Sequence, residues 1–322
     1  ISVAMSFHDG DTRAGYVSPT QVTRLRPGHQ AGQAEHSQLQ NKTDQLFTLT
    51  DGRRLGYSEY GTSDGTPVFY FHGFPGSRIS WPAFDHDDIA TKMNVRIIAV
   101  DRPGYGISDA VKHGRTLLEW PDDVIELADS LSLDKFAVLG ISGGGPYALS
   151  CAFKIPERLT KTVVVSGMGP ATAPGSKEGA SWLFPAMPGI VRWPMLMLMG
   201  MVVRNWPESV ASQMKDPLSS PDQELLEAHP ELATMIVADW QEAFRSGIGG
   251  THQEATLFSR AWGFRVQDIT SRVYLWHGDQ DKNVSASAAH FLADSIPNCH
   301  VTFSENDGHL SIVYKHLEDI LR

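Results

Sequence analysis

Short apolar runs alternate with segments of helical length along most of the chain after Leu46. Four runs come early, each four to six residues long: "VFYF" from Val68, "VRIIAV" from Val95, "FAVLG" from Phe136 and "TVVVSG" from Thr162. Two more come near the C-terminus, "VYLWHG" from Val273 and "HVTFS" from His300. Continuous apolar strands separated by helices are typical of a parallel sheet that helices cover on both faces.

A β-hairpin is predicted ahead of these strands. "LFTLT" from Leu46 and "RLGYSEYG" from Arg54 are rich in β-forming residues, and the turn "DGR" separates them. With this hairpin included, we expect an α/β protein with a mostly parallel, eight-stranded sheet and helices on both of its faces.

Residues 168–266 break the alternation. The segment combines proline-rich turns with helical apolar patterns and holds five of the eight tryptophans. We interpret it as a helical cap inserted over the C-terminal edge of the sheet, with residues 44–167 and 267–322 forming the core. Its methionines fit two interpretations equally, a hydrophobic substrate chamber or the filling of irregular helical cores. They are Met187, Met195, Met197, Met199 and Met201.

Residues 1–43 have a different texture from the rest of the chain. They are rich in Gln, Gly, His and Thr, and their scattered apolar residues follow no sustained period. Such a composition predicts an extended or weakly ordered N-terminal arm. An arm of this kind offers copies of the chain a means of associating as a homo-oligomer.

Composition and charge exclude several classes of partner. The 322 residues are 41% hydrophobic, so the chain can bury a substantial core. With 27 basic and 37 acidic residues, the formal charge of −10 argues against nucleic acid or an anionic membrane as partner. The longest apolar run, "MLMLMGMVV", is too short to span a bilayer. Two cysteines, Cys151 and Cys299, make no disulfide framework and no zinc motif.

The stretch "GISGG", from Gly140 to Gly144, carries the first sign of chemistry. It fits the pattern G-x-S-x-G and lies between a predicted strand and a predicted helix. A sharp strand-to-helix turn forces its central residue into strained dihedral angles, and small neighbours prevent clashes. The start of the following helix supplies amide donors and a partial positive charge. The pattern therefore predicts that Ser142 is a nucleophile.

A serine nucleophile needs a base and an acidic residue that orients the base. In this arrangement the two follow the serine in the order acid, then histidine, each in a loop after a later strand. "WHGDQDKNV" supplies two candidate acids, Asp279 and Asp281, directly after a predicted strand. "ENDGHLS" supplies His309 after the last one. His72 and His277 lie beside glycines at strand ends and are predicted to brace loops.

Taken together, the motifs resemble those of capped α/β-hydrolases, the group of esterases, lactonases and proline-iminopeptidase-like enzymes. The resemblance covers residues 46–322. It rests on "HGFPGSR", "DRPGYGISD", "GISGGGPYAL", "HGDQDKNV" and "DGHLS", which occur in the expected order. It implies the α/β-hydrolase fold, with Asp281 as the acid and His309 as the base of the catalytic triad. The position of "DRPGYGISD" after a strand and its Gly-Pro content favour a structural loop that braces the nucleophile turn over a catalytic Asp101 or Arg102.

The resemblance further implies an oxyanion hole formed by two backbone amides. "HGFPG" follows the strand "VFYF", where such enzymes place half of the hole. The implied donors are the N–H groups of Phe74 and Gly143. Two amides aimed at one carbonyl oxygen stabilise the negative charge that develops there. The implied machinery therefore needs neither a metal nor an organic cofactor.

We therefore expect a serine hydrolase that cleaves an ester or lactone of a fairly apolar small molecule. One alternative is an aminopeptidase of the proline-iminopeptidase kind, which needs acidic cap residues to bind a free amine. The chain departs from that group's "HGGPG" by having "HGFPG", and Glu224, Glu227 and Glu242 are its candidate acids. Lyases and C–C-bond hydrolases on the same triad are further alternatives, and a non-enzymatic ligand receptor is the last.

The expected location of the protein is the cytoplasm. Two N-glycosylation patterns occur, at Asn41 and Asn283. A glycan on Asn283 would crowd the rim of the site, two residues from Asp281. A protein inside the cell has no such conflict, and the low cysteine content agrees with a reducing compartment.

Overall fold

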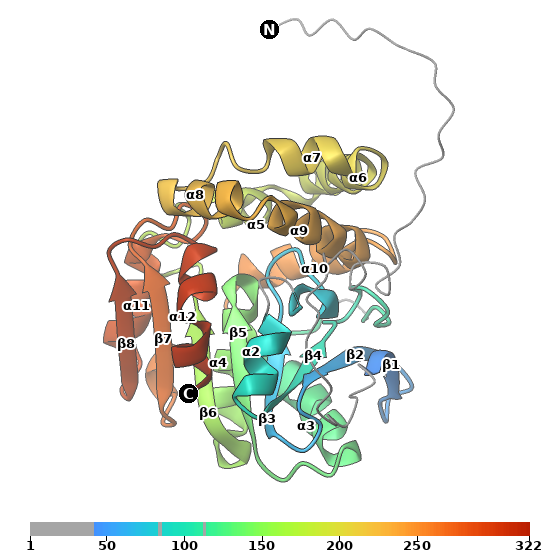
Figure 1. Cartoon of the computed structure of the whole chain (residues 1–322). Coiled ribbons are helices and arrows are strands. Elements are labelled where there is room, and N and C mark those ends of the chain that lie inside the picture. Colours follow the sequence, from blue (N-terminus) through green and yellow to red (C-terminus); the bar gives the residue numbers. More distant parts are fainter. Residues whose placement is uncertain (1–41, 83–85, 112–113) are drawn as a thin grey trace, which may run out of the picture. The chain divides into compact units, whose positions relative to one another are not determined.

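One eight-stranded sheet organises the chain (Figure 1). The computed structural model describes residues 42–82, 86–111 and 114–322. The expected N-terminal arm therefore lies outside the described residues, apart from its last two. The strands are β1 (Lys42–Thr48), β2 (Arg54–Gly61), β3 (Thr66–Phe71), β4 (Val95–Val100), β5 (Phe136–Ile141), β6 (Leu159–Val165), β7 (Val273–Gly278) and β8 (Cys299–Ser304).

The sheet order is β1-β2-β4-β3-β5-β6-β7-β8. β1 and β2 form the predicted antiparallel hairpin, and β2 also runs antiparallel to β4. All other pairs, from β4 through to β8, are parallel. The prediction of a mostly parallel sheet of eight strands is therefore confirmed. Because β3 to β8 run the same way, the loops that follow them meet at one edge of the sheet.

Apolar side chains point alternately to the two faces of the sheet along its strands, so both faces need to be covered. In β3, Phe69 and Phe71 face one apolar cluster, whereas Val68 and Tyr70 face the other. The first cluster includes residues of α3 (Trp120–Ser130), α4 (Gly145–Lys154) and α11 (Ala286–Ser295). The second includes residues of α2 (His86–Lys92) and α12 (Ser311–Leu321). Short 3-10 turns complete this part: η1 (Arg78–Ser80), η3 (Leu117–Glu119), η4 (Ser142–Gly144) and η5 (Pro156–Arg158).

The chain between β6 and β7 is helical and lies at one end of the sheet (Figure 1). We call it the helical segment (residues 168–266). It contains η6 (Ala180–Trp182), α5 (Leu183–Ala186), α6 (Gly189–Asn205), α7 (Pro207–Gln213), α8 (Ser220–Ala228), α9 (Pro230–Ala243) and α10 (Gly249–Phe258), and it ends where η7 (Val266–Asp268) begins.

Three of the five methionines do not fill a packed helical core. Met195, Met197 and Met201 of α6 are 41%, 56% and 48% exposed, beside other exposed apolar residues such as Ile190 and Trp206. Met187 and Met199 are half-buried. The three are exposed because α6 buries only one narrow stripe, which includes Leu196 and Val203, against the rest of the segment.

The turn from β5 into α4 needs glycine on both sides of Ser142. A side-chain carbon on Gly140 would lie 2.3 Å from the carbonyl oxygen of Gly144. One on Gly144 would lie 2.1 Å from the carbonyl oxygen of Phe71, the last residue of β3. Both neighbours are backbone atoms and cannot rotate away. The turn therefore packs against β3 at a distance that only glycine allows.

We predict that Gly144→Ala lowers the free energy of unfolding by at least about 1–3 kcal/mol, the usual cost of overpacking. Gly249→Ala is the matched control, because a side-chain carbon there meets nothing within 4 Å. We expect that variant to be unchanged or more stable by up to about 1 kcal/mol. Urea denaturation measures both, and equal losses in the two variants would contradict the packing argument.

Candidate active site

Ser142 occupies the strained position that the sequence predicts. Its φ angle is +54°, in the left-handed region that residues with a side chain rarely adopt. It opens η4 directly after β5, and α4 begins three residues later. The residue is 7% exposed, and a side-chain carbon on Gly73 would lie 3.8 Å from Ser142 Cβ. The serine therefore lies next to the loop that follows β3.

Asp281 and His309 are joined directly. His309 Nδ1 lies 2.7 Å from Asp281 Oδ2, and both side chains are buried. The other carboxylate oxygen of Asp281 accepts hydrogen bonds from the amides of Asn283 and Val284, at 2.7 and 2.9 Å. Asp281 is thus fixed from two sides. Of the two candidate acids, the structure brings Asp281 to His309, whereas Asp279 is exposed.

The two partners shift each other's pKa in opposite directions. Burial alone lowers the pKa of His309, but the charge of Asp281 and the hydrogen bond outweigh it and raise the pKa above 6.5. Burial alone raises the pKa of Asp281, but the charge and hydrogen bond of His309 hold it below 3.8. An imidazole with its pKa raised by a fixed carboxylate is a stronger base than a free one.

Ser142, Asp281 and His309 lie in the loops after β5, β7 and β8, all at the carboxyl edge of the parallel strands. No hydrogen bond links Ser142 Oγ to His309 within the described part of the chain. Contacts between nucleophile and base are often long before substrate binds. Because His309 Nδ1 is bound to Asp281, Nε2 is the nitrogen left for the serine.

The two predicted amide donors lie side by side. A side-chain carbon on Gly143 would lie 2.6 Å from Phe74 Cβ and 3.1 Å from the amide nitrogen of Phe74. The backbones of the β3 loop and the nucleophile turn are therefore in contact. The ring of Phe74 packs edge-on against Phe258 of α10, with centroids 5.4 Å apart. Both belong to the apolar cluster on the α4 face of the sheet.

"DRPGYGISD" braces the β3 loop directly, and Cζ of its Arg102 also lies 4.8 Å from the ring centroid of Tyr147 in α4, just after the nucleophile turn. Asp101 accepts hydrogen bonds from the amide and the Nη1 of Arg78, at 2.6 and 2.8 Å. Arg102 Nη2 donates to the carbonyl of Gly73 at 2.9 Å. The loop after β4 lies beside the loop after β3 because these two strands are neighbours in the sheet.

The two predicted bracing histidines do hold loops. Burial is the main cause that lowers the pKa of His72 well below 6.5, so this imidazole is neutral. Its Nε2 accepts from the amide of Arg102 at 3.2 Å, and its Nδ1 donates to the carbonyl of Gly73 at 2.9 Å. Nε2 of His277 lies 3.2 Å from the carbonyl of Val284, and burial lowers the pKa of this histidine as well.

Four buried acidic residues of the helical segment contact the loops of the site, and only Glu242 among them was a candidate from the sequence, as an amine ligand. Asp239 accepts from the amide and hydroxyl of Ser77, at 2.8 and 2.6 Å, and burial raises the pKa of Asp239 to about 8. Glu242 pairs with Arg78 at 2.6 Å. The other two are Asp222 and Glu254. Their helices carry ordinary amphipathic patterns, so no local signal marks these residues.

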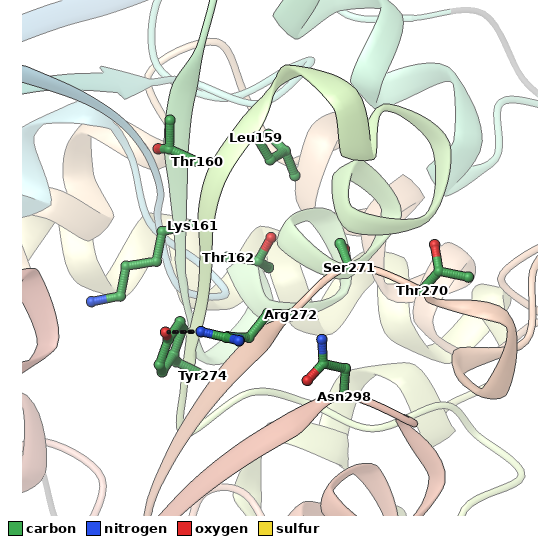
Figure 2. Close-up of a pocket in the computed structure, with 9 residues that line it drawn as sticks. All are labelled: Leu159, Thr160, Lys161, Thr162, Thr270, Ser271, Arg272, Tyr274 and Asn298. Atoms are coloured by element: carbon green, nitrogen blue, oxygen red, sulfur yellow. Dashed lines mark hydrogen bonds between the residues drawn. The ribbon is translucent and has the colours of Figure 1, made fainter.

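A shallow pocket of about 400 Å³ lies at the opposite edge of the sheet (Figure 2). Its lining includes Thr162 of β6, Tyr274 of β7 and Arg272, which directly precedes β7. Arg272 Nη1 lies 3.5 Å from the hydroxyl of Tyr274 (Figure 2). Because Ser142, Asp281 and His309 follow the other ends of the strands, this pocket is separate from them.

Within the described residues, no group of three or more His, Cys, Asp or Glu side chains is arranged to hold a metal ion. No helix described in the structure is long and apolar enough to cross a membrane. Both cysteines are free.

Comparison with known proteins assigns the family. The sequence profile of the alpha/beta hydrolase family matches residues 68–319, which is most of the chain and includes all five predicted site residues. The chain belongs to the alpha/beta hydrolase family. This membership accounts for the sheet order and for the placement of Ser142, Asp281 and His309 in three loops at one edge.

Individual relatives agree on the fold and differ in chemistry. A non-heme chloroperoxidase of Streptomyces lividans is 35% identical over 38% of this chain and 44% of its own length, so the chain spans less than half of that relative. A 2-hydroxy-6-oxononadienedioate/2-hydroxy-6-oxononatrienedioate hydrolase of Cupriavidus pinatubonensis is 25% identical over 83% of this chain and 89% of its own length. The crystal structure of an esterase from Rhodococcus sp. ECU1013 superposes with a TM-score of 0.65 at 20% identity, covering 87% of this chain and 97% of its own.

We predict that the imidazole of His309 titrates above pH 6.5 in the folded protein, because Asp281 stabilises the protonated form. Asp281→Asn removes that charge, so burial is opposed only by the smaller attraction of Asp222 and the pKa of His309 falls. NMR titration of the imidazole signals measures both values, and the signal that a His309→Gln variant lacks identifies the residue. An unchanged pKa in Asp281→Asn would contradict the electrostatic account.

Proposed function

We propose that the protein is a serine hydrolase that cleaves an ester or lactone of a fairly apolar small molecule through an acyl-enzyme intermediate. The observation that carries this proposal is the buried 2.7 Å bond between Asp281 and His309 at the sheet edge that also presents Ser142 at a positive φ. A fixed carboxylate, a histidine of raised pKa and a serine hydroxyl are the parts that acyl transfer requires.

The proposed reaction uses these groups in two balanced halves. His309 Nε2 takes the proton of Ser142 Oγ, which bonds to the substrate's carbonyl carbon while the π electrons move onto the carbonyl oxygen. The amides of Phe74 and Gly143 donate to this oxyanion. The C–O bond to the leaving alcohol then breaks, and the alcohol takes the proton from His309. Water repeats the sequence on the acyl-enzyme, releasing the acid and restoring the Ser142 hydroxyl.

The apolar character of the substrate rests on the residues around the nucleophile. Phe74 and Phe258 form an edge-to-face pair, and Tyr147 of α4 lies 6.3 Å from Phe258. Rings in this arrangement favour a ligand with an apolar acyl or alcohol portion. The Rhodococcus protein of similar fold is itself named as an esterase. We also propose that the helical segment forms a cap over the substrate site.

The three residues that the aminopeptidase alternative would need as amine ligands are not suited to that role. Glu242 is 2% exposed and pairs with Arg78, so its charge is already compensated inside the protein. Glu227 pairs with Lys215 on the surface, and Glu224 is exposed. None of these three is therefore a free, buried carboxylate that could bind a substrate amine.

A second candidate function is hydrolysis of a C–C bond in an oxo acid. The observation that favours it is the match to the Cupriavidus hydrolase, which extends over 83% of this chain. The same three residues could serve that reaction. Parallel assays with an aryl ester and with a 2-hydroxy-6-oxo dienoate discriminate between the two functions. An ester hydrolase turns over the ester faster than the dienoate, whereas a C–C hydrolase turns over the dienoate faster.

We predict that the wild-type protein hydrolyses short- and medium-chain p-nitrophenyl esters and that Ser142→Ala lowers kcat by at least about 10³-fold, because no acyl-enzyme can form. Release of p-nitrophenolate measures the rate, and circular dichroism confirms folding. Gly249→Ala serves as the control with unchanged kcat. Equal ester turnover by wild type and Ser142→Ala would refute the proposed function.

A further inference from the structure

Two buried carboxylates of the helical segment bind the loops that carry the proposed machinery. Asp222 of α8 is 1% exposed and Glu254 of α10 is 2% exposed. Neither belongs to the Ser-Asp-His set. Burying a carboxylate is costly unless it is fully hydrogen-bonded, and both of these are.

Asp222 holds the loop that carries His309. Its Oδ2 accepts from the amide of His309 at 2.8 Å, and its Oδ1 accepts from the amides of Leu310 and Ser311 at 3.0 and 2.9 Å. Its Oδ2 also accepts from the hydroxyl of Ser219 at 3.0 Å. Three successive amides at the start of α12, which have no partner within their own helix, are thus bound by one carboxylate.

The charge of Asp222 also acts on the imidazole. The ionisable groups that face His309 are Asp281 after β7, Asp222 of α8 and His277 of β7. Asp281 contributes most of the attraction that raises the pKa of His309 against its burial, and Asp222 adds to it in the same direction. Asp222 therefore fixes both the place of the backbone at His309 and part of the imidazole's basicity.

Glu254 holds the β3 loop through Arg102. The guanidinium of Arg102 forms a two-point ion pair with Glu254, at 2.5 and 2.9 Å, and both side chains are buried. Tyr105 donates its hydroxyl to Glu254 at 2.7 Å. From this fixed position Arg102 donates to the carbonyls of His72 and Gly73. A planar guanidinium bound on one edge presents its remaining donors in fixed directions.

The carbonyl of Gly73 belongs to the same peptide unit as the amide of Phe74. In a planar trans peptide the C=O and N–H bonds point in opposite directions. Arg102 Nη2 and His72 Nδ1 both donate to the Gly73 oxygen, at 2.9 Å each, which fixes the plane of this peptide. The N–H of Phe74 is therefore held pointing away from Arg102. Gly143 and the nucleophile turn lie beside that nitrogen.

We infer that Asp222 and Glu254 are positioning residues for the active site, Asp222 for the base His309 and Glu254, through Arg102, for the oxyanion donor at Phe74. The inference rests on the proposed function. It gives the helical segment a second task besides enclosing substrate, because two of its helices complete the catalytic geometry of loops that follow β3 and β8.

The two residues have different expected kinetic signatures. In Asp222→Asn, the acid limb of the kcat/KM profile moves to lower pH, and its plateau falls by about tenfold as His309 loses its place. In Glu254→Gln, kcat falls by about 10–100-fold, KM changes less than about twofold, and the acid limb stays in place. The affinity of an alkylboronic acid, whose adduct with serine carries an oxyanion, falls in Glu254→Gln by about the same factor as kcat.

Asp123→Asn is the matched control. Asp123 of α3 is 3% exposed and pairs with the partly buried Arg53 and Arg115, so its loss also breaks ion pairs of a buried carboxylate. No residue of the proposed machinery contacts it among the described residues. We expect thermal melting to show a loss of stability similar to that of the two test variants, with kcat, KM and the pH profile unchanged.

Milder variants keep the test decisive if a carboxylate variant does not fold. Ser219→Ala removes only the hydroxyl that holds Asp222, and Tyr105→Phe removes only the hydroxyl that holds Glu254. Each is expected to change the same kinetic quantities as the matching carboxylate variant, with rates lowered by about two- to fivefold. Folded variants with wild-type kinetics, or a control that shows the same signatures, would overturn the inference. Absence of Ser142-dependent turnover in the wild type would instead refute the proposed function and the inference with it.

Discussion

The close packing of the β5–α4 turn against the end of β3 is the constraint on which the site depends. Ser142 is held at a φ of +54° because Gly144 touches the backbone of Phe71 and Gly140 touches that of Gly144. No larger residue fits at either glycine without moving the backbone. The strain at one serine is therefore maintained by the packing of two neighbouring strands, which are among the most buried parts of the chain.

The loops around this turn are held by charge rather than by regular structure. Arg78 pairs with Asp101 and Glu242, and Arg102 pairs with Glu254, all of them almost completely buried. Buried ion pairs add little net stability compared with apolar packing, but they fix the orientation of the groups that they hold. In this protein the groups that they hold are the peptide at Gly73 and the loop around the proposed oxyanion donor. The arrangement thus links the helices between β6 and β7 to the geometry of the proposed reaction.

The strands and the paired residues Asp281 and His309 were predictable because their signals are local. Apolar runs such as "VRIIAV" mark buried strands, and "HGDQD" and "DGHLS" follow strands in a fixed order. The contacts of Asp222 and Glu254 were not predictable. They span 87 residues to His309 and 152 residues to Arg102, and one acidic residue on an amphipathic helix resembles any other. The exposure of the methionines on α6 was likewise hidden, because an apolar helical pattern does not reveal which side is covered.

Covalent capture of the substrate's acyl group on Ser142 is the most direct measurement of the central claim. An aryl ester is mixed with the protein, the reaction is stopped by acid within milliseconds, and peptide mass spectrometry locates the added mass. The account predicts an acyl group on the peptide that contains Ser142, formed at least as fast as the steady-state turnover. Turnover without any acyl adduct, or an adduct on another residue, would contradict it.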